Sequence, residues 1–82
     1  MLNDQTFLIE DIYVPSSRRK TLNIETVHEI ARSMLEIGQR TPILVRRDQH
    51  RFVLVEGLHR LEACKALGEK TITGLVVRAR RN

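Results

Sequence analysis

The chain passes from a predicted strand into a predicted helix through the stretch "VEGLHRLEACKALG", Val55–Gly68. Apolar residues recur at helical spacing after Gly57, and Gly68 is a residue type that commonly ends a helix in the left-handed conformation. The stripe that faces the core is predicted to contain Leu58, Leu61, Ala63, Cys64 and Leu67. Packing explains this stripe, but it leaves the glycine and the polar groups at the start of the helix without an explanation.

Proline, glycine and turn-forming residues divide the rest of the chain. Thr6–Val14 is predicted to be one strand that ends before Pro15, where a polar loop begins. Asn23 has the side chain to cap a second helix, and Gly38 is suited to end it. The apolar face of that helix is predicted to contain Val27, Ile30, Ala31, Met34 and Leu35.

Two short apolar segments flank the turn "DQH" and predict a β-hairpin over residues 43–47 and 51–55. A last strand is predicted over residues 70–79. The resulting order is strand, helix, strand, strand, helix, strand, which predicts a small α+β domain. The 82 residues are expected to form a single domain whose residues 78–82 are a basic tail.

The net charge of +4 is unevenly distributed along the chain. Clustered arginines attract phosphates, so weak and salt-sensitive contact with DNA is expected, the alternative being a solvated surface. The residues expected to make this contact are Arg46, Arg47, Arg78, Arg80 and Arg81.

The sequence also limits the location of the protein and the kinds of site it holds. No run approaches the roughly 18 apolar residues of a membrane span, and no signal peptide is recognisable, which predicts a cytoplasmic protein without membrane contact. The single cysteine, Cys64, cannot form an internal disulfide, and no Cys or His cluster predicts a metal site made by the protein alone.

The polar groups at the strand-to-helix junction are suited to a phosphate site. The first turn of a helix presents backbone N–H groups without intrahelical partners, and the helix dipole favours an anion there. Gly57 lets an anion approach the backbone, Arg60 offers a two-pronged guanidinium, and His59 can donate a hydrogen bond. The structural alternative is a tight turn at Gly57 followed by two exposed side chains.

Glu56 needs a separate interpretation, because a carboxylate repels phosphate. It is the candidate catalytic residue as a general base, or else a ligand of Mg²⁺ or an orienting partner of Arg60. The alternative is a simple salt bridge with Arg60 or Arg18.

Four features, in this order, resemble the N-terminal domain of the ParB family, within the ParB/sulfiredoxin fold, over roughly residues 7–77. The first is a strand leading to a loop with Pro15, Arg18 and Arg19, and the second is a helix ending in glycine. The third is "GQRTPILV", which is similar to the family's Gly-x-x-x-Pro-[Ile/Leu] box. The fourth is "EGLHRLEACKALGEKTI", which is similar to its Gly-Glu-Arg-Arg-x-x-Ala-x-x-x-x-Gly box.

The resemblance implies that two boxes bind the phosphates of a nucleotide, commonly CTP, with Mg²⁺ accompanying the nucleotide. The implied binding residues are Gly38, Thr41 and Pro42 in one box, Gly57, His59, Arg60 and Ala63 in the other, and Arg18 and Arg19 in place of the family's loop arginine.

The fourth box departs from the partition-protein pattern. Its His59-Arg60 pair is closer to sulfiredoxin and to the free-serine kinases, where such a pair holds the phosphates of ATP. Sulfiredoxin needs a cysteine between the glycine and the histidine, and Leu58 stands there instead. Cys64 lies on the apolar stripe, so a sulfiredoxin reaction is not expected.

Three functions therefore remain open. The first is a module that binds CTP or ATP in DNA partition or DNA-linked regulation, with a DNA-binding partner protein or a homodimer as candidate assemblies. The second is a small NTPase, phosphotransferase or nuclease that uses Glu56. The third is a protein-interaction domain whose nucleotide site has degenerated.

Overall fold

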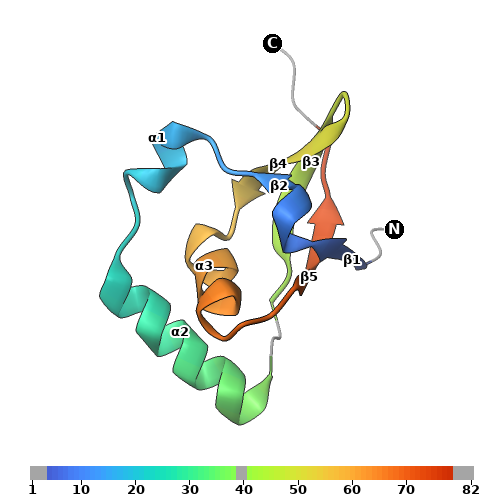
Figure 1. Ribbon diagram of the computed structural model, residues 1–82. Coiled ribbons are helices and arrows are strands. Elements are labelled where there is room, and N and C mark those ends of the chain that lie inside the picture. Colours follow the sequence, from blue (N-terminus) through green and yellow to red (C-terminus); the bar gives the residue numbers. More distant parts are fainter. Residues whose placement is uncertain (1–3, 39–40, 79–82) are drawn as a thin grey trace.

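The computed structural model describes residues 4–38 and 41–78 (Figure 1). It confirms the α+β class, with one mixed sheet of strand order β1-β5-β3-β4-β2. The elements are β1 (Gln5–Leu8), a 3₁₀ turn η1 (Ile9–Asp11), β2 (Ile12–Tyr13), α1 (Ser16–Arg19), α2 (Ile24–Ile37), β3 (Ile43–Asp48), β4 (Arg51–Glu56), α3 (Leu58–Ala66) and β5 (Thr71–Val76).

The prediction of one strand over Thr6–Val14 is wrong, because η1 divides it into two strands at opposite edges of the sheet. β1 pairs with β5 in antiparallel fashion, whereas β2 pairs with β4 in parallel. The Ile9 N–H donates to the Lys70 carbonyl at 2.9 Å and fixes the turn. Ile9, the first residue of η1, and Ile12, the first residue of β2, are both buried. Glu10 and Asp11 interrupt the apolar run at the turn, but an acidic pair alone does not distinguish one interrupted strand from two short ones.

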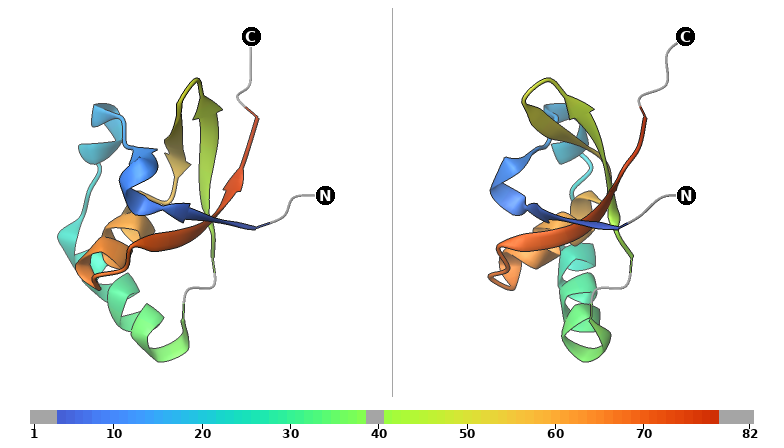
Figure 2. Two further views of the ribbon diagram at one scale, coloured as in Figure 1. Left: turned by 45° about the vertical axis from the view of Figure 1, so that its right-hand side comes forward. Right: turned by 90° about the vertical axis from the view of Figure 1, so that its right-hand side faces the viewer.

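The sheet curls because three residues of η1 connect its two edges. Figure 2 shows β1 running through η1 directly into β2 where the sheet curls. The Phe7 and Phe52 rings meet there edge to face, with centroids 4.9 Å apart. The enclosed core consists of Phe7, Ile9, Ile12, Val14, Ile43, Val45, Leu54, Leu58, Leu61, Cys64 and Ile72.

The two longer helices end as the sequence predicts, but α2 is less buried than its pattern suggests. The Asn23 side-chain oxygen accepts from the Thr26 N–H at 3.0 Å, and Gly38 follows the helix with φ +80°. α2 packs mainly against α3, and Val27 is its one buried residue. Leu35, predicted to face the core, is 74% exposed, because α2 lies outside α3 (Figure 1) and the covered part of its apolar face is limited to Val27, Ile30, Ala31 and Met34.

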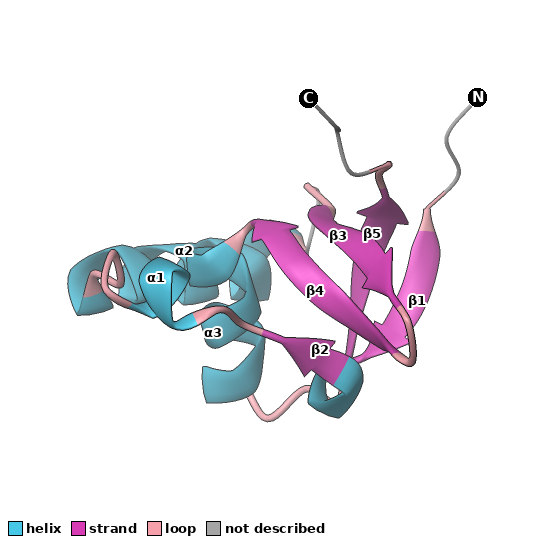
Figure 3. Cartoon of the chain, turned by 90° about the horizontal axis from the view of Figure 1, so that it is seen from above, coloured by secondary structure: helices cyan, strands magenta, loops and turns pink. Residues whose placement is uncertain are grey.

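The predicted loop after Pro15 contains the short helix α1, which the sequence analysis missed. Seen from above, α1, α2 and α3 lie together on one side of the molecule and the sheet on the other (Figure 3). The hairpin of β3 and β4 is confirmed, each strand extending one residue beyond its prediction. β5 is shorter than the predicted residues 70–79, although the Val77 N–H still donates to the Val45 carbonyl at 2.8 Å.

Strand direction determines which loops meet. β4 is parallel to β2 and antiparallel to β3. The end of β2, the start of β3 and the end of β4 therefore share one end of the sheet. The strand-to-helix junction at Gly57 lies at that end.

Candidate functional site at the start of α3

Gly57 is required by its backbone conformation and by its packing. Its φ of +112° and ψ of 28° lie in the left-handed region that favours glycine. A Cβ at this position would lie 2.7 Å from Ile43 Cγ2, so β3 packs directly against the glycine. The sharp turn lets β4 run into α3 with one residue between them.

The start of α3 has the electrostatic character of an anion site. Leu61 is the first residue whose N–H closes a helical turn, donating to the Gly57 carbonyl at 2.9 Å. No side chain caps the helix, and its first turn contains no acidic residue. The N–H groups of this turn thus add to the positive end of the helix dipole without a neutralising carboxylate in the turn itself.

A pocket of about 360 Å³ lies at this helix start. It brings together segments about 15 residues apart in the sequence, one before β3 and the other at the β4–α3 junction. The lining residues are Thr41, Pro42, Leu44, Glu56, Gly57 and Arg60. Five of these six were candidate site residues in the sequence, so the two predicted boxes share one pocket.

Glu56 is exposed and borders the pocket together with Arg60. Within residues 4–38 and 41–78, no ion pair joins Glu56 to Arg60 or to Arg18, so the salt-bridge alternative has no support there. The same residues contain no cluster of three or more His, Cys, Asp or Glu side chains suited to a metal. Glu56 is therefore the carboxylate that this pocket offers to a ligand or to its counter-ion.

His59 has a structural contact that the sequence did not reveal. The Asn23 backbone N–H donates to His59 Nε2 at 3.0 Å. A backbone N–H can only donate, so Nε2 carries a lone pair and the proton of the neutral ring lies on Nδ1. His59 thereby ties the first turn of α3 to the N-cap of α2. It is not among the residues lining the pocket, and a phosphate would have to approach Nδ1–H.

Four other predicted residues are not among those lining the Gly57 pocket. Gly38 borders a separate pocket of about 260 Å³ at the C-terminal end of α2, and Ala63 is fully buried in α3. Arg18 is exposed on α1, and Arg19 Nε donates to the Val14 carbonyl at 3.4 Å. The loop arginines therefore reach the junction only with a rearrangement of α1 or of their side chains.

Two of the arginines proposed for DNA contact, Arg46 and Arg47, are consecutive residues of β3 and point to opposite faces of the sheet. Arg46 is half-buried on β3, and Arg78 is exposed beyond β5. The Arg47 guanidinium lies over the Phe52 ring, 5.0 Å from its centroid. Arg80 and Arg81 lie outside the described residues. The contact of Arg51 with Tyr13 was not predicted from the sequence, because the pairing of β2 with β4 is a long-range feature without a local signal.

Cys64 is a core residue, 1% exposed. Burial raises the pKa of its thiol and the Glu69 charge raises it further, while Arg60 acts in the opposite direction. A thiol with these properties is a poor nucleophile at neutral pH, in agreement with the sequence interpretation.

The raised pKa of Cys64 predicts a stability that falls in alkaline solution. Below the unfolded-state pKa, about 8.5, the thiol is protonated in both states and the stability is fully present. As the pH rises through and above that value, only the unfolded state ionises readily, so stability is lost by at most about 1.4 kcal/mol per pH unit. Urea unfolding at several pH values should show a shallower alkaline decline for Cys64→Ala. Parallel declines would contradict this.

The model of the ParB N-terminal domain family matches residues 5–82. The chain belongs to this family. The probable chromosome-partitioning protein ParB of Campylobacter jejuni is 39% identical over 62 residues, which cover 76% of this chain and 22% of that protein. The chain therefore spans about a fifth of the length of this ParB relative.

Two solved structures relate this ParB-type domain to its wider fold. Sulfiredoxin from Arabidopsis thaliana superposes with a TM-score of 0.84 at 27% identity, covering 94% of this chain and 86% of that one. The C-terminally truncated ParB from Caulobacter crescentus, complexed with CTP-gamma-S, superposes with a TM-score of 0.75 at 25% identity, covering 98% and 46%. Among its described residues, this ParB-type domain has no helix that is long and apolar enough to cross a membrane.

Proposed function

We propose that the pocket at Gly57 binds the phosphates of a nucleoside triphosphate, CTP or ATP, within a ParB-type domain that serves DNA partition or DNA-linked regulation. The observation that carries this proposal is that Thr41 and Pro42 line one pocket with Gly57 and Arg60, at the start of a helix without a cap. The family membership and a ParB relative complexed with CTP-gamma-S support it.

Each residue would act through ordinary phosphate chemistry. The first-turn N–H groups of α3 would donate to phosphate oxygens, and the left-handed turn at Gly57 keeps a side chain out of their way. Arg60 is half-buried and would donate two parallel hydrogen bonds. Mg²⁺ would arrive with the nucleotide, because magnesium in such sites is bound by phosphate oxygens, by water and by one or two carboxylates. Glu56 would be the carboxylate of this pocket.

Arg60→Ala should weaken nucleotide binding about tenfold or more, because it removes a charge-assisted hydrogen-bonding pair. Isothermal titration with CTP and ATP, each with Mg²⁺, measures the effect. Arg78→Ala, which removes an exposed arginine outside the pocket, is the matched control and should bind normally. Circular dichroism should show that both variants are folded. Flat titrations of the wild type with all four nucleoside triphosphates would exclude the proposal.

A second function, turnover of the bound nucleotide or of a DNA phosphodiester, is favoured by one observation. Glu56 borders the pocket with its carboxylate exposed and with no ion pair to Arg60 or Arg18 in the described chain, so it is available as a general base. Glu56→Gln should then lower phosphate release, or plasmid nicking, about a hundredfold while nucleotide binding is kept. Turnover that survives Glu56→Gln would remove this role.

Contact with DNA is a further part of the proposal. Arg46, Arg47 and Arg78 would supply weak, non-specific contacts whose strength falls with salt concentration. Assembly as a homodimer, or with a DNA-binding partner protein, would bring more such contacts to one duplex.

A further inference from the structure

Asn23, the N-cap residue of α2, is bound from two different helices. Within α2, its side-chain oxygen accepts from the Thr26 N–H at 3.0 Å, and its carbonyl accepts from the Val27 N–H at 3.1 Å. From α3, His59 Nε2 accepts a hydrogen bond from the Asn23 N–H at 3.0 Å. The start of α2 is therefore held partly by a side chain that lies 36 residues later in the chain.

α3 is the firmly held partner in this contact, and α2 is the weakly held one. Leu58 and Leu61, which flank the pair His59-Arg60 in the sequence, are 7% and 0% exposed and belong to the core. α2 has a single buried residue, Val27, and packs mainly against α3. Loss of the bond from Asn23 to His59 would consequently loosen the start of α2 and leave α3 in place.

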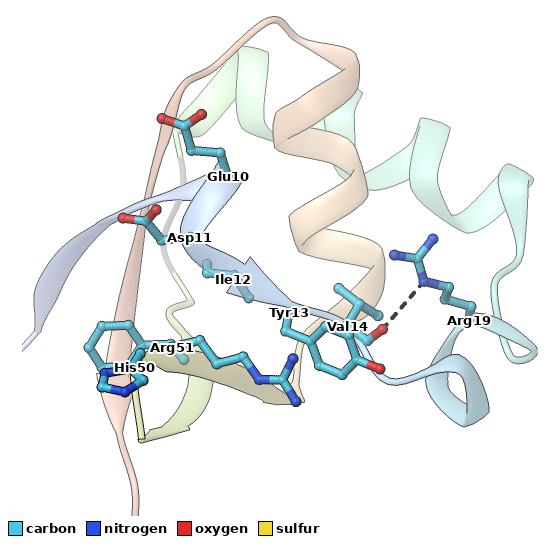
Figure 4. Close-up of a pocket in the computed structure, with 9 residues that line it drawn as sticks. Glu10, Asp11, Ile12, Tyr13, Val14, Arg19, His50 and Arg51 are labelled. Carbon is cyan, nitrogen blue, oxygen red and sulfur yellow. Dashed lines mark hydrogen bonds between the residues drawn. The ribbon is translucent and has the colours of Figure 1, made fainter. Parts of the chain in front are cut away.

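The short helix α1 is attached at the same point. We call residues 16–23 the α1 segment. The Leu22 N–H donates to the Arg19 carbonyl at 3.2 Å, so the hydrogen-bonded turn after α1 extends to the residue before the N-cap. α1 contains no buried residue, and the Arg19 Nε bond to the Val14 carbonyl is long, 3.4 Å (Figure 4). Among the described residues, the bond from Asn23 to His59 is the one hydrogen bond that ties this segment to a distant element.

The bond from Asn23 requires a neutral His59 ring. Nε2 accepts through its lone pair, whereas a ring that gains a proton carries an N–H on both nitrogens and can accept on neither. The new Nε2–H would then oppose the Asn23 N–H across 3.0 Å. Histidine is the side chain whose charge ordinarily changes between pH 5 and 8, so this loss lies in a physiologically accessible range.

Charged side chains lie on the elements around His59 but do not bind it. They are Glu56 at the end of β4, Arg60 and Glu62 in α3, and Arg18, Lys20 and Glu25 near the start of α2. β5 contains no charged residue, and those of β3 lie at its hairpin end. In the part of the chain that the structure describes, no ion pair or hydrogen bond joins any of these groups to His59. The contact that protonation of His59 changes is therefore the one with Asn23.

We propose that His59 is a proton-sensitive link between α3 and α2. Its neutral ring holds the start of α2 and the α1 segment against α3, and a gained proton releases both. While the link is closed, Arg19 lines a cavity of about 490 Å³ that shares no lining residue with the Gly57 pocket. Release would let Arg18 and Arg19 move toward the strand-to-helix junction, which they do not reach in the closed arrangement.

The link would also respond to phosphate, a step that rests on the proposed function of the Gly57 pocket. A phosphate bound by the first-turn N–H groups of α3 lies in the same helical turn as His59, and its negative charge favours the protonated ring. Arg60, the next residue, lines that pocket. Phosphate binding and the bond from Asn23 would therefore weaken each other reciprocally.

NMR spectroscopy of the wild type tests the link without any ligand. At about pH 7.5, long-range ¹H–¹⁵N correlations should show the His59 proton on Nδ1, and the Asn23 amide should be protected from hydrogen exchange. At about pH 5.5, the protection factor of the Asn23 amide should fall about fivefold, which corresponds to the loss of one hydrogen bond of ordinary strength. A neutral ring with its proton on Nε2, or an Asn23 protection factor that is the same at both pH values, would overturn the proposal.

Variants assign the response to His59. His59→Gln supplies an amide oxygen that can accept from the Asn23 N–H but takes up no proton in this range, so the protection of Asn23 should be equal at both pH values. His59→Ala should give low protection at both. His28→Gln and His50→Gln, at the other two histidines, are the matched controls and should keep the wild-type response. A response to acid that persists in His59→Gln would contradict the assignment.

Adding CTP with Mg²⁺ at about pH 7.5 separates the link from the proposed nucleotide site. CTP should lower the protection of the Asn23 amide about threefold in the wild type and leave it unchanged in His59→Gln, because the loss requires a titratable ring. Binding of CTP by calorimetry without a change at Asn23 would reject the coupling to phosphate. Absence of CTP and ATP binding would reject the nucleotide site itself, and the response to acid would still decide whether His59 forms the link.

Discussion

Gly57→Ala is expected to destabilise the protein by about 3 kcal/mol or more, because two independent costs meet at one position. The first is backbone strain, since φ is +112° and an L side chain rarely adopts that conformation. The second is overpacking, since the added Cβ would lie 2.7 Å from Ile43 Cγ2 and 3.2 Å from the Ile43 Cα. Ile43 is 1% exposed and belongs to a central strand, so it cannot move aside cheaply.

Gly68→Ala is the matched control for this prediction. Gly68 also has a positive φ, +80°, but a Cβ there would meet nothing within 4 Å. Gly68→Ala would therefore introduce backbone strain without a steric clash, and the free energy of unfolding should fall by about 1 kcal/mol. Urea unfolding followed by far-UV circular dichroism measures both variants. Equal losses would show that the contact with Ile43 contributes nothing.

The comparison also tests how fold and site are connected. Gly57 was proposed from the sequence as the residue that lets an anion approach the backbone, and the structure adds the packing against Ile43. The two roles depend on the same conformation, so Gly57→Ala should weaken nucleotide binding even in the folded fraction. Gly68→Ala should bind nucleotide normally, since Gly68 lies at the other end of α3.

The parts of the fold that could be predicted from the sequence are those with local signals. Asn23 and Gly38 mark the ends of α2 through capping chemistry, and Gly57 and Gly68 do the same for α3. The hairpin follows from two apolar segments and the turn-forming residues between them, although the turn itself is only Gln49 and His50. The pocket itself was predicted in part, because Thr41, Pro42 and Arg60 were grouped through the two boxes.

The parts that could not be predicted depend on long-range pairing. The only local mark between β1 and β2 is the acidic pair Glu10 and Asp11, which does not show that the two strands lie at opposite edges of the sheet. The pairing of β2 with β4 brings Tyr13 to Arg51, and the packing of α2 on α3 brings Asn23 to His59, 36 residues away. Both contacts require the complete topology.

The extent of core contact is the remaining feature that helical periodicity does not determine. Leu61 and Leu35 both occupy apolar positions of helices and were both predicted to face the core. Leu61 of α3 is 0% exposed within the core cluster, whereas Leu35 of α2 is 74% exposed. A periodic stripe shows which face of a helix is apolar, but the neighbouring elements decide how much of that face is covered.

Because the two leucines differ in exposure, replacing each by alanine should have a large effect on stability at Leu61 and a negligible one at Leu35. Leu61→Ala should lower the free energy of unfolding by about 2–5 kcal/mol, because it removes buried methyl groups and leaves a cavity that the surrounding core residues fill incompletely. Leu35→Ala should change it by less than about 0.5 kcal/mol, since an exposed side chain loses little contact and alanine favours helix. Urea unfolding of the two variants beside the wild type measures both. A loss at Leu35 comparable to that at Leu61 would mean that another surface covers α2 in solution, which a concentration dependence of its unfolding midpoint would reveal.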